Sequence, residues 1–205
     1  MSHTLGVRQA QKQKTRQAFL DAALALLEEQ SLSSLGLREV TRAVGVAPTA
    51  FYRHFPSTAD LGVALVEEAL GSLHAVIAGT VSAAGDGDER IERAIALIAR
   101  HVAEYPAHIR FIARERNGGV QKVRAAIAEQ LTRFTAEVKT ALAQHPESAG
   151  WSDDDLLMLA GLYVDQMLVT ASNLLDASPE EQDQVIRAAT RRMRLISIGR
   201  RHWLG

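Results

Sequence analysis

The chain of 205 residues contains no cysteine, and this absence excludes several kinds of chemistry at once. Without thiols there is no disulfide framework, no thiolate-bound metal and no cysteine nucleophile. The G-x-S-x-G pattern of a serine nucleophile is absent as well. His101 and His108 are seven residues apart in a pattern that does not match metal ligands. We therefore expect no enzyme, no metal site and no resident cofactor, and the lack of cysteine suits a reducing cytoplasm.

Secretory and membrane-spanning signals are missing too. Residues 1–17 are basic but contain no apolar core, so they do not match a secretory signal. The most apolar stretch, residues 156–175, is long enough to span a bilayer, but it carries Asp165, Gln166 and Asn173, which are costly in lipid. We interpret it as a buried helix and expect a cytoplasmic protein with no membrane partner.

Positive charge is concentrated near the N-terminus. Of 23 Lys and Arg and 24 Asp and Glu, residues 1–56 hold seven and four, a net charge of +3 in a chain whose net charge is −1. The first 20 residues hold four positive charges and no acid. This asymmetry favours a polyanionic partner at the N-terminal end.

Strand signals are scarce, and apolar residues recur at helical spacing between short Gly, Pro and Ser breaks. The pattern predicts an all-α fold of about nine helices at residues 9–30, 37–44, 48–54, 58–82, 88–104, 107–116, 119–144, 153–176 and 179–199. Asp88, Ser152 and Ser178 are the expected N-caps of three of them. We divide the chain into a basic unit, residues 1–56, and a larger helical body, residues 57–205.

Two short helices near residues 37–55 are joined by a tight turn. Gly36 stands at the cap position with Glu39 three residues on, which is a capping box without the hydroxyl. Gly45 suits the left-handed exit of the first helix, and Pro48 suits the first position of the second. This arrangement is typical of a helix-turn-helix.

The second of these helices has two different faces. Ala47, Phe51 and Phe55 lie on one face at spacings of four, while Thr49, Tyr52 and Arg53 lie opposite with His54 on the flank. An apolar back with polar tips is the layout of a DNA recognition helix, although a small packing helix with a solvated face has the same pattern.

The first 70 residues resemble the TetR family of bacterial repressors. The resemblance rests on KTRQAFLDAALALLEE and on LREVTRAVGVAPTAFYRHFPSTADL, including the G-V-x-x-x-x-x-Y-x-H-F spacing. The segments GVRQAQKQKTR, FIARERNG and MRLISIG are similar to the FabR/DesT-like branch, repressors of unsaturated fatty-acid synthesis genes.

The resemblance implies a role in DNA binding for eight residues. Tyr52 and His54 would bind phosphates, and Thr49, Arg53 and the turn near Ala47 would approach bases. The cations Lys12, Lys14 and Arg16 would lie near the backbone or the minor groove. Two positions depart from the family pattern, since Thr58 replaces a frequent Lys and Gly36 replaces the usual Ser or Thr cap.

The resemblance also places a dimer interface on the last two helices. Residues 156–175 carry an apolar stripe with small members that permit close helix approach: Leu157, Ala160, Gly161, Val164, Leu168, Ala171 and Leu175. A matching stripe follows near the C-terminus: Val185, Ala189, Met193 and Ile196. Two such helices from each subunit would form a four-helix bundle, unless both stripes face their own subunit's core.

Candidate effector-binding residues lie in the body. Their apolar and aromatic members are Leu97, His101, Phe111, Ile112, Phe134, Tyr163 and Met167, each of which also suits a plain core. The branch resemblance implies a long-chain acyl-CoA as the ligand. Arg110, Arg114 and Arg116 are then candidates for its phosphates, although exposed basic clusters are commonly only solvated.

These patterns together predict a homodimeric, ligand-responsive repressor that binds palindromic operator DNA. The alternatives are a TetR-type sensor of hydrophobic drugs that controls efflux, and a helical ligand-binding protein or enzyme without DNA activity.

Overall fold

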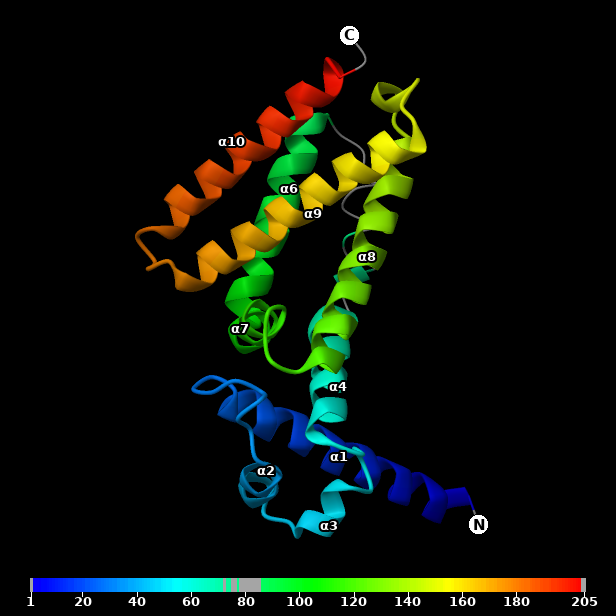
Figure 1. The fold of residues 1–205 in the computed structure, drawn as a ribbon, viewed down its shortest axis with the longest axis vertical. Helices are drawn as coiled ribbons and strands as arrows, with labels where there is room; N and C mark the ends of the chain where they lie inside the picture. The colour runs from blue at the N-terminus through cyan, green and yellow to red at the C-terminus, as the bar shows by residue number, and fades with distance from the viewer. Residues whose placement is uncertain (1, 72, 75–76, 78–85, 204–205) are drawn as a thin grey trace. The chain divides into compact units, whose positions relative to one another are not determined.

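The computed structural model describes residues 2–71, 73, 74, 77 and 86–203, and in these residues every regular element is a helix (Figure 1). The all-α prediction is confirmed. Eight elements are longer than one turn and a half: α1 (Ser2–Leu26), α2 (Leu37–Val44), α4 (Thr58–Gly71), α6 (Gly87–Glu104), α7 (Pro106–Glu115), α8 (Gln121–Ala143), α9 (Asp153–Asp176) and α10 (Gln182–Arg201). Two are shorter, α3 (Pro48–Phe51) and the 3-10 helix η1 (Pro146–Ser148).

The chain packs as two compact units. The first unit combines Met1–Ala69 with Arg110–Ile127, and the second combines Leu70–Ile109 with Ala128–Gly205. The packing unit that holds the N-terminal helices is therefore larger than residues 1–56 and is built from two separate stretches of the chain. The functional division at residue 57 stays a prediction.

The helix-turn-helix begins with α2, whose bounds agree with the predicted residues 37–44. Glu39 accepts a hydrogen bond from the Gly36 N–H at 2.9 Å, so the carboxylate half of the capping box forms as expected. Gly45 ends the helix at φ +76°, in the left-handed region that glycine adopts at little cost. The N–H of Val46 then reaches back to the Thr41 carbonyl and closes the turn.

Helix α3 is shorter than the predicted residues 48–54. Pro48 stands at its start as expected, but regular α-helix ends at Phe51. Tight turns continue the segment, because the N–H groups of Arg53 and His54 bond to carbonyls three residues back. The side chains after Phe51 thus still follow one another around a helix-like coil.

Three phenylalanines form the centre of the first unit. Phe19 of α1 packs edge-on against Phe51 at a centroid distance of 5.3 Å and against Phe55 at 6.3 Å. All three are buried, together with Val40 of α2. Because these side chains come from α1, α2 and the α3 segment, their burial fixes the three elements to one another.

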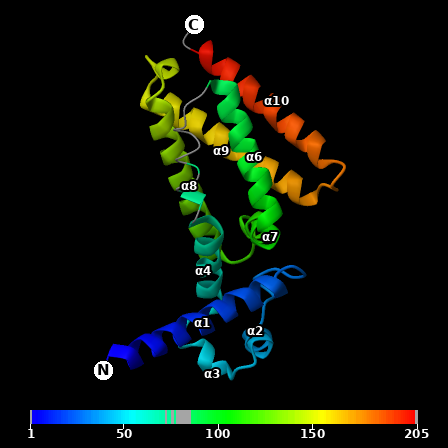
Figure 2. The ribbon, with the colours of Figure 1, turned by 180° about the vertical axis from the view of Figure 1, so that it is seen from behind.

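The second unit is a helical bundle in which α6, α9 and α10 contact one another and lie side by side in both views (Figures 1 and 2). Its core contains Ile91 and Ile95 of α6, Leu159 and Leu174 of α9, and Met193 of α10. The stretch of residues 156–175 that was long enough for a bilayer lies inside α9. Leu156, Leu159 and Leu174 are buried but Met158, Leu162 and Val169 are exposed, so the helix is buried on one side and not all round.

The N-caps of the second unit match the predictions only in part. The Ser152 hydroxyl accepts the Asp155 N–H and caps α9 as expected. The cap of α6 is Asp86 and not Asp88, because the Asp86 side chain accepts the Glu89 N–H at 2.9 Å. Helix α10 starts after Glu181 and not after Ser178. The predicted end of the 58–82 helix lies outside the described residues.

Candidate nucleic-acid interface

The α3 segment presents three predicted DNA-contacting side chains to solvent. Thr49, Tyr52 and Arg53 are exposed, Tyr52 with 61% of its surface, while Phe51 and Phe55 beside them are buried. Ala47, at the N-cap position, is exposed as well. The amphipathic layout read from the sequence is therefore present in space, with the aromatic back held by Phe19.

Helix α1 adds cations to the same region. Lys12 and Lys14 are exposed, and Arg16 is half-buried because its guanidinium lies over the Phe55 ring, 5.0 Å from the centroid. A cation over an aromatic face is attracted by the ring quadrupole. This contact holds the Arg16 charge beside the α3 segment. Sequence reasoning missed it, since no local pattern connects α1 with the end of the recognition segment.

His54 sits between the aromatic core and the cations. Its ring lies 5.6 Å from the Phe19 ring, and its Nδ1 atom is buried with no hydrogen-bond partner among the described residues. A buried N–H without an acceptor would be costly, whereas a bare lone pair costs less. We infer that the proton of the neutral ring is on Nε2, so that atom is the donor of the ring.

The pKa of the His54 imidazole is lowered from its ordinary value of 6.5. The first cause is burial, and the others are the positive charges of Lys12, Arg16 and Arg53. These three cations come from α1 and from the α3 segment, so their fields overlap at one imidazole. The structure thus brings Lys12, Arg16, Arg53 and His54 of the predicted set into one positive region.

The two positions that depart from the family pattern take structural roles. The Gly36 N–H is bonded to the Glu39 carboxylate. Thr58 opens α4, while the neighbouring Ser57 hydroxyl accepts the Asp60 N–H and caps that helix. The assignment of all eight residues to DNA contacts stays a prediction.

The predicted effector-binding residues divide between the two units. Phe111 and Ile112 are buried in the first unit, which also contains Arg110, Arg114 and Arg116. Leu97, His101, Phe134, Tyr163 and Met167 belong to the second. Phe134 stacks on His74 at 4.1 Å, and Tyr163 and Met167 pack on the core of α6 and α10.

Two members of this group have specific polar environments. The pKa of the His101 imidazole is lowered by burial first, and its Nε2 atom has no hydrogen-bond partner among the described residues. The Arg114 guanidinium, by contrast, is bonded to three backbone carbonyls, those of Leu27, Glu28 and Gln30. Arg114 is therefore already engaged within the protein, and we leave it out of the effector site proposed below.

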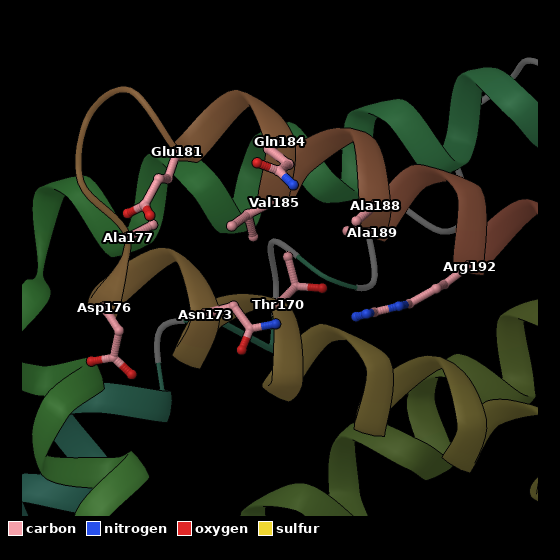
Figure 3. Close-up of a pocket in the computed structure, with 10 residues that line it drawn as sticks. All are labelled: Thr170, Asn173, Asp176, Ala177, Glu181, Gln184, Val185, Ala188, Ala189 and Arg192. Carbon is pink, nitrogen blue, oxygen red and sulfur yellow. The ribbon is translucent and has the colours of Figure 1, made fainter.

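A cavity of about 410 Å³ opens between α9 and α10 (Figure 3). Its lining mixes polar and apolar groups, with Asp176 and Glu181 at one end and Arg192 at the other. None of the predicted effector-binding residues lines it, and of the predicted interface stripe only Val185 and Ala189 do.

The predicted dimer stripes turn mostly inward. Ala160, Ala189 and Met193 are at most 3% exposed, so their side chains have no surface to offer a partner. Several others are half-buried against the clusters of their own unit: Val164, Ala171, Leu175, Val185 and Ile196. Gly161 and Leu168 are also half-buried, and Leu157 is exposed. The alternative that these stripes face their own core thus describes most of their surface.

Other apolar side chains of α9 and α10 are exposed. Besides Leu157, they are Met158, Leu162 and Val169 of α9 and Leu195 and Ile198 of α10, each between 44% and 70% exposed. We call these five residues the outer face. Exposed apolar side chains concentrated on two adjacent helices are typical of an interaction surface.

Among the residues that the structure describes, no three His, Asp or Glu side chains gather in a way that would hold a metal ion. No helix in this part of the chain is long and apolar enough to cross a membrane.

Comparison with known proteins agrees with this geometry. Residues 19–65 match the sequence profile of the bacterial regulatory proteins of the tetR family. This segment contains Phe19, the helix-turn-helix and the start of α4, which are the elements that hold the positive region.

Solved structures of regulators have a similar fold over most of the chain. The FadR regulator of Bacillus subtilis, in complex with stearoyl-CoA, is 14% identical with a TM-score of 0.69, covering 88% of this chain and 96% of that one. The fatty acid degradation regulator FadR of Bacillus halodurans is 16% identical with a TM-score of 0.70, covering 89% and 94%. A TetR-family regulator of Syntrophomonas wolfei reaches a TM-score of 0.75 at 14% identity, covering 91% and 96%.

The chain therefore has the fold of TetR-type transcriptional regulators, with an N-terminal helix-turn-helix. At these identities the likeness establishes the fold and not the ligand or the target genes.

The first prediction concerns the protonation of His54. In an NMR titration, its imidazole should titrate with a midpoint below 6.5, and Lys12→Ala should raise that midpoint by removing a nearby positive charge. Lys14→Ala is the matched control, because Lys14 is not among the charges that act on His54. Equal shifts in both variants would contradict the assignment.

The same lowered pKa fixes the sign of the pH effect on stability. Folded protein binds fewer protons at His54 than unfolded protein does, so the His54 contribution is complete above about pH 6.5. It is lost as the pH falls through the lowered folded pKa. In urea titrations, the free energy of unfolding of the wild type should therefore fall more with acidification than that of His54→Gln.

Proposed function

We propose that the protein is a homodimeric transcriptional repressor of the TetR type that binds palindromic operator DNA. The observation that carries this proposal is the positive region itself. Exposed Thr49, Tyr52 and Arg53 stand on a buried aromatic back, and the charges of Lys12, Arg16 and Arg53 converge on His54. A major groove accepts such a segment, with phosphates bound by the cations and base edges within reach of Arg53 and Thr49.

A dimer follows from the geometry of DNA. Two recognition segments related by a two-fold axis read half-sites one helical turn, roughly 34 Å, apart. The outer face supports dimerisation through α9 and α10, because its five apolar side chains would otherwise stay in water. In this proposal the interface is centred on the outer face, with Leu157 at its edge.

The proposed effector is a long-chain acyl-CoA. Support comes from the fold shared with two FadR regulators, one of them solved with stearoyl-CoA, and from the sequence likeness to the FabR/DesT-like branch. The regulated genes would be those of unsaturated fatty-acid synthesis. Apolar groups such as Phe134, Tyr163 and Met167 would suit an acyl chain, and Arg110 and Arg116 would suit phosphates.

Whether the effector favours DNA binding or release depends on its differential affinity for the two states of the protein. A sensor of hydrophobic drugs would use the same apolar groups without a phosphate site. A helical ligand-binding protein without DNA activity would need neither the exposed Arg53 nor the cations of α1.

The experiment that tests DNA binding is selection from a pool of random duplexes at low salt. We expect enrichment of a palindrome whose half-sites are one helical turn apart. Failure of any duplex to be enriched or shifted would overturn the proposed function.

Two variants then separate phosphate contacts from base reading on the selected duplex. Lys14→Ala should weaken binding to all sequences alike and reduce the slope of log K against log salt by about 0.9. Arg53→Ala should instead relax the preference at one base pair by roughly 1–3 kcal/mol. A uniform loss for Arg53→Ala would show that Arg53 binds phosphate.

The effector is tested by titrating oleoyl-CoA and palmitoyl-CoA into the protein–duplex complex. At least one of them should change the DNA dissociation constant by about 5- to 150-fold, and free coenzyme A should not. If neither acyl-CoA has an effect while a hydrophobic cationic dye does, the drug-sensor alternative replaces this one.

Dimerisation is tested by Leu162→Glu, which puts a charge on the outer face. We expect the dimer dissociation constant in sedimentation equilibrium to rise by roughly 100-fold, because a carboxylate would be buried without a partner. Val7→Glu is the matched control, since Val7 is similarly exposed but lies on α1. An unchanged dimer in Leu162→Glu would exclude this face.

A further inference from the structure

Two adjacent residues at the end of α7 bind the connection between α1 and α2. Arg114 and Glu115 belong to the stretch Arg110–Ile127, which packs in the first unit together with the helix-turn-helix. Both reach the backbone of residues 27–32, where α1 has ended and the chain turns toward α2.

Arg114 caps the C-terminus of α1 from another part of the chain. Its Nη1 donates to the carbonyls of Leu27 at 2.8 Å and Gln30 at 2.7 Å, and its Nη2 donates to that of Glu28 at 3.2 Å. These carbonyls follow Leu26, the last residue of α1, so they lie just beyond the negative end of the helix dipole. The last turn of α1 contains no basic residue, so Arg114 supplies the cation that the helix itself lacks.

Glu115 binds the next part of the connection. Its side chain is 1% exposed, and its Oε1 accepts the Leu32 N–H at 2.8 Å. The carboxylate lies against Gly118, where an added Cβ would collide with it. The Leu32 side chain is buried in turn, and it lies so close to Gly62 of α4 that a Cβ there would collide with it. The Leu32 backbone and side chain are thus both held.

Only one of the two carboxylate oxygens of Glu115 is hydrogen-bonded among the described residues. Its Oε2 atom is buried and has no hydrogen-bond partner among the described residues. A carboxylate that gives up water for a single N–H loses much of its solvation free energy. The docked position of the connection is therefore less stable than it would be if both carboxylate oxygens were hydrogen-bonded.

We propose that Arg114 and Glu115 are positioning residues for DNA binding: they hold the α1–α2 connection, and thereby set where α2 and the α3 segment lie on α1. The inference rests on the proposed function. The connection leads directly into α2, which contacts both α1 and α3 and whose Val40 is buried. Arg114 therefore acts through the backbone and not by binding an effector phosphate.

The test combines hydrogen exchange of the peptide covering residues 27–36 with DNA affinity, corrected for the active fraction, on the selected duplex. Arg114→Ala and Glu115→Met should speed exchange in this peptide and weaken DNA binding, each by about tenfold. Glu115→Gln keeps an acceptor for the Leu32 N–H and removes the buried charge. Its NH₂ group would stand where Oε2 has no partner, which also costs free energy, so both losses should be present but smaller than in Glu115→Met, which lacks the acceptor altogether.

Control variants separate this role from general effects. Arg133→Ala removes an equal charge from the exposed surface of α8 and should change neither readout. If Arg114→Ala does not fold, Arg114→Lys keeps the charge but lacks the guanidinium fork that bridges several carbonyls, and it should show the same losses.

Three outcomes would overturn the proposal. The first is wild-type exchange in both Arg114→Ala and Glu115→Met. The second is faster exchange with unchanged DNA affinity, which would mean that the connection does not position the recognition segment. The third is a loss in Glu115→Gln equal to that in Glu115→Met. If wild-type protein itself binds no DNA, the proposed function fails with it, while the exchange data still report separately whether the two residues hold the connection.

Discussion

The burial of Phe19 between Phe51 and Phe55 is the contact on which the positive region depends. The α3 segment has one turn of regular helix, too short to be stable by itself, so its conformation must come from packing. Edge-to-face contacts of three buried rings supply that packing and fix the rotation of the segment about its own axis. Thr49, Tyr52 and Arg53 point outward because Phe51 and Phe55 occupy the buried side of the segment.

The same aromatic cluster organises the charges around it. Arg16 lies over Phe55 and His54 lies beside Phe19, so a cation and an imidazole from different elements share one apolar support. The pKa of His54 is lowered first by burial and then by these positive charges, so protonation of the imidazole is unfavourable here. If the segment binds DNA as proposed, the phosphate backbone would reduce the repulsion among the cations.

Sequence reasoning succeeded where the signal was local and failed where two distant segments meet. The bounds of α2 and α9, the Glu39 contact and the left-handed Gly45 all follow from residues within one turn of each other. Which side of α9 and α10 would face a partner was harder to predict, because these helices are apolar on more than one side. Periodicity identifies an apolar face but not what covers it. Here the stripes that contain Ala160 and Met193 face the core of their own unit, while Leu162 and Leu195 are exposed. The Arg16–Phe55 and Arg114–Leu27 contacts have no local pattern at all.

The composition of the first unit bears on how a ligand response would reach DNA. Helices α4, α7 and α8 each begin in one packing unit and end in the other, and Arg110–Ile127 packs with the N-terminal helices although it is far from them in sequence. A conformational change that displaces the end of α7 must therefore either carry the α1–α2 connection with it or break the bonds of Arg114 and Glu115. Glu115 is buried with only one of its carboxylate oxygens hydrogen-bonded, so breaking its bond costs less free energy. The difference in free energy between moving the connection and releasing it is therefore reduced. An element with two outcomes of similar free energy is what a ligand with modest differential affinity is able to bias. Completing the hydrogen bonding of residue 115 would make the connection more rigid and the response to any ligand weaker.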